Sequence, residues 1–234
     1  LLRAPQSMVT LLDRPARVLQ RWDELASAGK LVALAGADAH ARLGFRQRTD
    51  PDTSSVHVPV PGYEASFRAF SNHVVLDAPL SGDAQQDADR VIAAIRSGRV
   101  YSVIDALATP GGLTFTASSG SASVQMGDNL AIAGDVLLKA AVTAPPGTTL
   151  VLLRDGRRIH EVTAAGLEMN AGTDRAVYRI EAYTADPPGG PGIPWMVSNP
   201  IYAGLLPKLD APAIVPVPVS RLPARSSEAA VCWP

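Results

Sequence analysis

The sequence feature that most constrains the fold is a change of hydrophobic period at residues 109–112, which read Thr-Pro-Gly-Gly. Before this point apolar residues recur at helical spacing, as Val91, Ile92 and Ile95 do. After it, apolar and polar residues alternate over short runs, as in residues 113–117. A period of 3.6 places one stripe of a helix in a core, whereas a period of two places one face of a strand there. The chain is therefore expected to begin as α/β and to continue as all-β.

The length agrees with more than one domain, because 234 residues exceed the ~100–150 residues of an ordinary domain. We expect an α/β part over residues 1–108 and a β-sandwich domain over residues 109–206. Residues 207–234 contain repeated prolines with alanine and valine between them, which favours an extended linker or tail.

The β part has short alternating runs separated by turn residues, a pattern typical of an immunoglobulin-like sandwich. Asp155-Gly156 between two such runs predicts the turn of a hairpin. His160 falls on an exposed hairpin strand, and Trp195 is expected to pack in the core or at its rim.

Two helices are predicted in the α/β part. The first begins near Asp13, a suitable N-cap, and ends at Gly29, with Trp22 on its apolar stripe. The second extends from about Ser81 to Gly98. Trp22 is interpreted as core rather than as a ligand platform.

The apolar run of residues 31–35 is predicted to be a strand that is buried on both faces. Gly36, Asp38 and His40 follow it directly, and polar groups at the carboxyl end of a buried strand are where ligands bind in α/β folds. In an extended backbone Asp38 and His40 point to the same side, so their oxygen and nitrogen atoms could share one Zn, Mn or Fe ion. A capping aspartate beside a solvated histidine is the alternative interpretation.

Residues 41–61 are polar without a clear period and are predicted to form a long loop. Arg42 in this loop is the candidate for contacting a small anionic or ester substrate, because a guanidinium binds phosphate or carboxylate oxygens in pairs. A solvated surface arginine is the alternative for Arg42. His57 is given little functional weight. His73 is interpreted as a structural histidine that is hydrogen-bonded beside a strand start, and lining of the site is the alternative.

The string GADAHARLG, residues 36–44, resembles the last metal-binding motif of the PHP (polymerase and histidinol phosphatase) superfamily, in particular its carbaryl-hydrolase-like group. Less specific likeness extends over SNHV (71–74), residues 79–108 and PWMVSNPIY (194–202). The resemblance implies the carboxyl-terminal part of a distorted β/α barrel followed by the sandwich. It also implies a metal-dependent hydrolase in which Asp38 and His40 are ligands and a metal-activated water attacks a phosphoester.

The chain departs from that family in one respect. PHP enzymes carry a His-x-His pair on their first strand, but this sequence has four histidines and no such pair. We therefore expect this chain to be a carboxyl-terminal piece that is incomplete as an enzyme. The rival hypothesis is a binding or spacer module of the β-sandwich type whose attached barrel remnant is inactive.

Composition excludes some partners. A formal net charge of −1 offers no electrostatic basis for binding nucleic acid, and no apolar stretch approaches the ~20 residues that a membrane span needs. The single cysteine, Cys232, rules out a disulfide within the chain but leaves the compartment open, so both a cytoplasmic and an exported protein remain possible.

Overall fold

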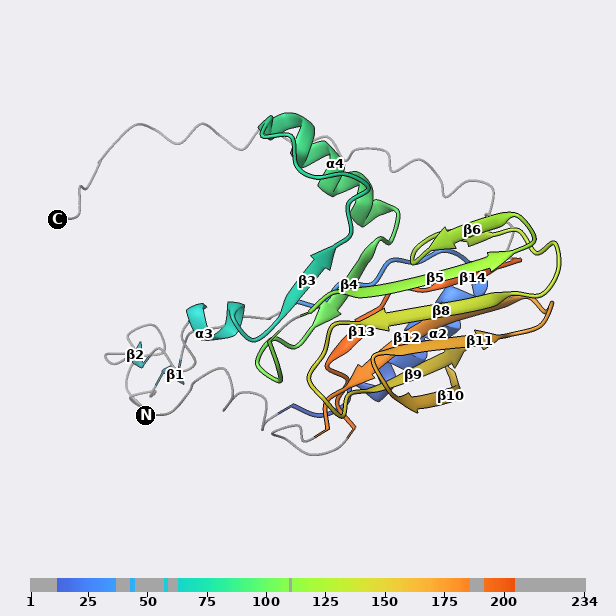
Figure 1. Cartoon of the computed structure of the whole chain (residues 1–234). Helices are drawn as coiled ribbons and strands as arrows, with labels where there is room; N and C mark the ends of the chain where they lie inside the picture. The colour runs from blue at the N-terminus through green and yellow to red at the C-terminus, as the bar shows by residue number, and fades with distance from the viewer. Residues whose placement is uncertain are drawn as a thin grey trace.

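A computed structural model of the chain describes residues 12–36, 43–44, 57–58, 63–109, 111–185 and 192–204. In this part the protein is mostly β, with two largely antiparallel sheets packed face to face and one helix across the outer face of the larger sheet (Figure 1).

The larger sheet has the strand order β10-β9-β12-β13-β4-β3, and β14 pairs with β12 and with β7. Its strands are β3 (Ser71–Val74), β4 (Val100–Val103), β7 (Asn129–Leu130), β9 (Thr149–Arg154), β10 (Arg157–Thr163), β12 (Ala176–Tyr183), β13 (Met196–Ser198) and β14 (Ile201–Ala203). Every pair in it is antiparallel except β14 with β7.

The smaller sheet has the order β11-β8-β5-β6 and is antiparallel throughout. Its strands are β5 (Leu113–Ser119), β6 (Ala122–Gln125), β8 (Leu137–Val142) and β11 (Gly166–Asn170). A further two-residue ladder joins β1 (Leu43–Gly44) to β2 (His57–Val58).

The main core lies between the two sheets, and the predicted alternation explains it. Leu113, Phe115 and Ala117 of β5 face inward, while the residues between them are more exposed. They pack in one cluster with Ile180 and Leu152 of the larger sheet. The Asp155-Gly156 turn joins β9 to β10, and both residues have the positive φ that such a turn requires. The alternation of β5 and this hairpin are therefore confirmed.

Three helices are described: α2 (Ala16–Ala28), α3 (Tyr63–Phe67) and α4 (Ala84–Arg96). The predicted helices near residues 13–29 and 81–98 correspond to α2 and α4. Asp83 caps α4 by accepting a hydrogen bond from the Gln86 amide at 2.8 Å. Figure 1 shows α4 projecting away from the sheets, whereas α2 lies behind the larger one.

The structure corrects the α/β expectation in two places. The described residues form no β/α barrel, and β3 and β4 are antiparallel strands of the large sheet. Because β4 also pairs with β13, the larger sheet contains strands from both sides of the predicted boundary at residue 108. The division of the chain into domains at that residue stays a prediction. Strands β13 and β14 are separated at Asn199-Pro200, since proline cannot donate a backbone hydrogen bond.

Candidate functional site

The predicted metal and substrate residues, Asp38, His40 and Arg42, lie outside the described residues. What the structure describes is the segment that leads to them, Leu31–Gly36, and the surface on which that segment lies. The candidate site is therefore built from this segment.

Residues 31–35 do not form the predicted buried strand. They are extended without a backbone ladder, and Leu31 and Leu34 are 39% and 53% exposed. The apolar run led to a wrong prediction because its hydrogen-bond partners are side chains from distant parts of the sequence rather than a neighbouring strand.

Three residues of this segment each have their backbone amide and carbonyl bound by a single side chain from elsewhere in the chain. The Tyr202 hydroxyl accepts from the Leu31 amide at 3.0 Å and donates to the Leu31 carbonyl at 3.1 Å. The Asn199 side chain accepts from the Ala33 amide at 2.8 Å and donates to the Ala33 carbonyl at 2.9 Å. These bonds fix one edge of the segment to the large sheet, as a neighbouring strand would.

Asn72 repeats the arrangement at Ala35, accepting from its amide at 3.0 Å and donating to its carbonyl at 2.8 Å. The Ser102 hydroxyl is a second acceptor for the same amide, at 3.1 Å, and it donates to Asn72. The last firmly bonded residue of the segment is thus three positions before Asp38.

These anchoring residues were missed as functional residues. Tyr202 comes from β14, Asn72 from β3 and Ser102 from β4, while Asn199 lies between β13 and β14. Asn199 is buried and also donates to the Val100 carbonyl at 2.8 Å. The only sequence signal was their presence in SNHV, in residues 79–108 and in PWMVSNPIY, the three stretches named above as less specific than the predicted metal motif.

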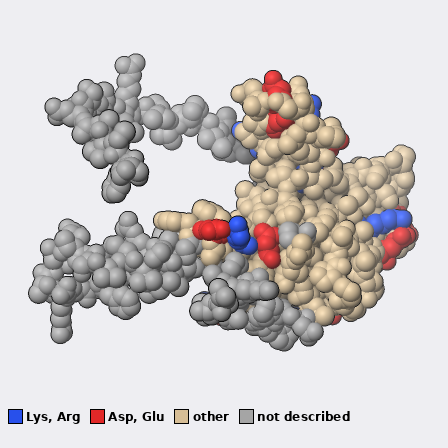
Figure 2. Space-filling model, turned by 60° about the vertical axis from the view of Figure 1, so that its left-hand side comes forward, with Lys and Arg blue, Asp and Glu red and all other residues tan. Residues whose placement is uncertain are grey.

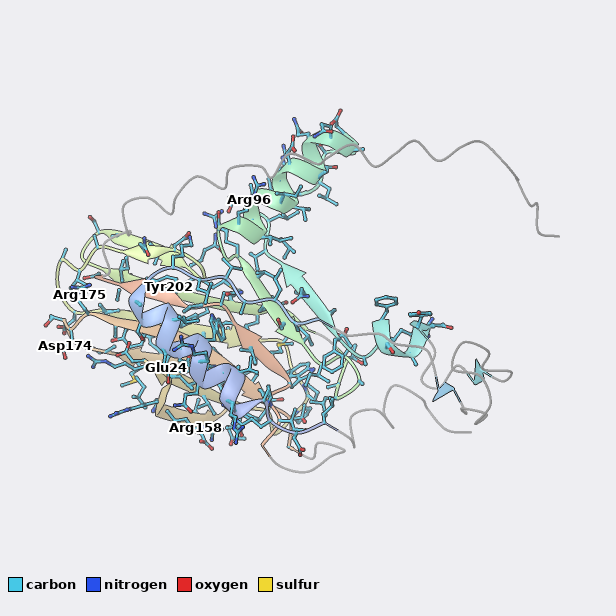
Figure 3. All side chains as sticks on the ribbon, turned by 180° about the vertical axis from the view of Figure 1, so that it is seen from behind. Glu24, Arg96, Arg158, Asp174, Arg175 and Tyr202 are labelled. Atoms are coloured by element: carbon cyan, nitrogen blue, oxygen red, sulfur yellow. The ribbon has the colours of Figure 1, made fainter. Side chains whose placement is uncertain are left out.

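Helix α2 is fixed to the same sheet by buried charges. Arg179 of β12 binds Asp23 of α2 with two hydrogen bonds, Nε to Oδ1 at 2.7 Å and Nη2 to Oδ2 at 2.8 Å. Arg179 also binds Glu181 at 2.7 Å and lies over the Trp22 ring, 5.3 Å from its centre. Figure 3 shows α2 across the outer face of the sheet, with Tyr202 near one of its ends.

Arg14, just before α2, completes this network by binding both carboxylate oxygens of Glu181, at 3.0 and 2.8 Å. Burial disfavours the charged carboxylate, but the hydrogen bonds and charges of Arg14 and Arg179 outweigh burial and lower the pKa of Glu181 to about 2. Burial and the neighbouring Glu181 raise the pKa of Tyr183 to about 12. At neutral pH the network therefore holds ionised Glu181 and neutral Tyr183.

An apolar groove of about 350 Å³ opens between α2, the segment and the ends of β4 and β13. Trp22 and Val18 line it from α2, Leu34 and Ala35 from the segment, and Trp195 from the end of the loop before β13. On the face drawn in Figure 2 most of the surface is uncharged, and the charged side chains lie on α4, in one group near the middle and at one edge. The volume is within the range of small-molecule sites, and the groove begins three residues before Asp38.

No group of three or more metal-ligating side chains occurs in the part of the chain that the structure describes. His73 lies against Tyr101, with its Nδ1 3.3 Å from the hydroxyl, and His160 is exposed on β10. The side chain of His57 lies outside the described residues. No described helix is long and apolar enough to cross a bilayer.

Comparison with protein-family models, with curated proteins and with solved structures finds no match.

Proposed function

We propose that this chain is the carboxyl-terminal part of a PHP-type metal-dependent hydrolase, most plausibly a phosphoesterase, in which Asp38 and His40 are metal ligands. In this proposal the two sheets form an immunoglobulin-like sandwich, which supports α2 and the segment that leads to the motif. The motif GADAHARLG supports the assignment of the ligands by resemblance.

The observation that carries the proposal is the anchoring of Ala35. Metal ligands must be held in a fixed geometry by groups that are themselves held. Four hydrogen-bonding side chains of the large sheet fix alternate residues up to Ala35, and α2 is joined to the same sheet through Arg179. This anchoring supports the proposal, because a metal ligand needs such a fixed backbone and a solvated loop histidine does not.

The bound divalent ion would lower the pKa of a water molecule and neutralise charge on the phosphoester oxygens. The residues of this chain would orient that ion from one side through Asp38 and His40. Arg42 would bind the anionic part of the substrate, and the apolar groove would receive its non-reacting part.

The test has two readouts. Calorimetric titration with Mn²⁺ or Zn²⁺ should show weak binding to this chain, because catalytic zinc takes about three protein ligands and this chain offers two. Asp38→Ala and His40→Ala should abolish the binding, while His160→Ala, on the exposed β10 strand, should leave it unchanged. Phosphomonoester and phosphodiester turnover, measured on the longest natural form of the protein, should fall with the same two substitutions.

The alternative function is a binding or spacer module with an inactive barrel remnant. It is favoured by the distribution of the core, because the largest cluster of buried apolar residues lies between the two sheets. Metal binding that is unchanged by Asp38→Ala and His40→Ala would support this alternative and contradict the hydrolase.

A further inference from the structure

We propose that a polar pocket between α2 and the β9–β10 turn binds a small molecule that carries one carboxylate or phosphate group. The pocket lies between Gln20 and Glu24 of the helix and Gly156 and Arg157 of the turn. Helix α2 separates it from the apolar groove, and its described lining includes no residue assigned to the hydrolase. The proposal therefore stands apart from the metal site.

The walls of this pocket are held together. Its volume is about 450 Å³, within the range of small-molecule sites. The turn touches the helix directly, because a Cβ added to Gly156 would lie only 2.9 Å from the Asp23 side chain. Asp23 is in turn bound to Arg179 of β12 by two hydrogen bonds. Helix, turn and sheet thus shape the pocket without a ligand.

The carboxylates that line the pocket already have partners. Asp23 uses both of its oxygens to bind Arg179. Glu24 accepts hydrogen bonds from two side chains of its own helix, at 2.9 and 3.2 Å. Asp155 accepts a hydrogen bond from a backbone amide of β12 at 2.9 Å. These acidic groups therefore need no cation from solution.

The guanidinium groups that line the pocket, in contrast, have unused hydrogen-bond donors. Arg179 is 2% exposed, and its bonds to Asp23 and Glu181 use three of its five N–H groups. Arg14 binds Glu181 through its two terminal nitrogens, so its Nε–H has no acceptor among the described residues. Arg157 has no hydrogen-bond or ion-pair partner in the described part of the chain.

This excess of donors selects an anionic ligand. A guanidinium binds carboxylate or phosphate oxygens in pairs, so a ligand with such a group would use the donors that the protein leaves free. Glu24 and Asp155 limit the charge of the ligand, because a polyanion would be repelled by them. The ligand is therefore a small molecule with a single anionic group.

The test is a titration of the full chain with sodium phosphate and with sodium acetate at constant ionic strength. The Nε–Hε signals of Arg14, Arg157 and Arg179 should shift together and saturate at millimolar salt. The salt that binds more tightly identifies the anionic group. Arg42→Ala, in the proposed hydrolase site, should leave these shifts unchanged, so this proposal and the hydrolase can fail separately.

Two substitutions that remove one positive charge test the pocket. Arg157→Gln should weaken the binding of the anion at least fivefold. Arg96→Gln should change it less than twofold, because Figure 3 shows Arg96 on α4, apart from α2. Both side chains are exposed, so both variants should keep the fold.

Two substitutions that add one negative charge to the first turn of α2 form a second matched pair. Ala16→Glu places the charge in the polar pocket and should weaken binding at least fivefold. Val18→Glu places it on the apolar groove and should change binding less than twofold. An acidic residue in the first turn favours a helix, so α2 should persist in both variants.

Three results would overturn the proposal. The first is the absence of saturable shifts at these three arginines with either salt. The second is equal weakening by Arg157→Gln and Arg96→Gln, and the third is equal weakening by Ala16→Glu and Val18→Glu. Either equality would show that net charge, rather than the polar pocket, attracts the anion.

Discussion

At the scale of single residues, Arg179 joins α2 to the large sheet through two buried hydrogen bonds to Asp23. It is 2% exposed, and its partners Asp23 and Glu181 are also buried. A buried charge that loses its partner keeps its desolvation penalty, so removal of one member costs far more than the net contribution of the pair. We therefore expect a large loss of stability when Arg179 is replaced.

Arg179→Met should lower the free energy of unfolding by about 3–5 kcal/mol, because it leaves Asp23 without its bidentate partner. Lys139→Met is the control, since it breaks the exposed pair with Glu168 and should cost under about 1 kcal/mol. Urea denaturation measures both. If both substitutions lowered the free energy of unfolding by the same small amount, the buried charge network would not be what holds α2 on the sheet.

The pH dependence of stability should report Glu181. Its folded pKa of about 2 lies below the unfolded value of about 4.3, so the ionised carboxylate stabilises the fold above pH 4.3. This stabilisation, on the order of 3 kcal/mol, should be lost as the pH falls from about 4.3 toward 2. Glu181→Gln should flatten the stability profile in that window, whereas Glu168→Gln at an exposed pair should not.

At the scale of elements, the anchored segment shows what an apolar run can and cannot predict. The strand β5 could be predicted because apolar and polar residues alternate along it. The Asp155-Gly156 hairpin could be predicted because its two strands are neighbours in the sequence. Residues 31–35 could not, because the side chains that bind both backbone groups of Leu31, Ala33 and Ala35 come from positions 37 to 171 residues away. An asparagine that replaces a backbone ladder leaves no periodic signal in a single sequence.

Asn72→Ala should release Ala35 without releasing the whole segment. The variant removes two hydrogen bonds to Ala35 and one from Ser102, and it should cost about 1–2 kcal/mol. Amide exchange should accelerate at Ala35 and stay unchanged at Leu31, which Tyr202 binds independently. Asn170→Ala, on the far sheet, is the matched control. Equal acceleration along the segment would show that its bonds form and break together.

The junction of α4 with the sheets depends on Gly127, whose φ is +89°. An added Cβ would lie 2.1 Å from the Ser97 carbonyl oxygen at the end of α4. Gly127→Ala should therefore cost roughly 3 kcal/mol or more, from backbone strain and overlap together. Gly172→Ala has φ +74° but open space, so it should cost only about 1 kcal/mol. Thermal denaturation of the two variants separates overlap from strain.

At the scale of the whole molecule, the large sheet contains strands from both of the parts into which the change of hydrophobic period divided the sequence. β3 and β4 come from the half that was expected to be α/β, yet they extend a sheet whose other strands follow residue 109. Four-residue strands of mixed burial carry too little pattern to distinguish a barrel strand from a sandwich edge. The sandwich could be predicted from its long alternating strands, but the way in which the amino-terminal half joins it could not.

We propose that the large sheet supports the metal ligands Asp38 and His40, which follow Leu31–Gly36 in the chain. The most direct measurement is the relaxation that paramagnetic Mn²⁺ causes in the amide signals of the folded chain. We expect selective broadening at Ala35 and at its anchors Asn72 and Ser102, and loss of that broadening in Asp38→Asn and His40→Gln. Broadening that is absent from these amides, or that persists in both variants, would contradict it.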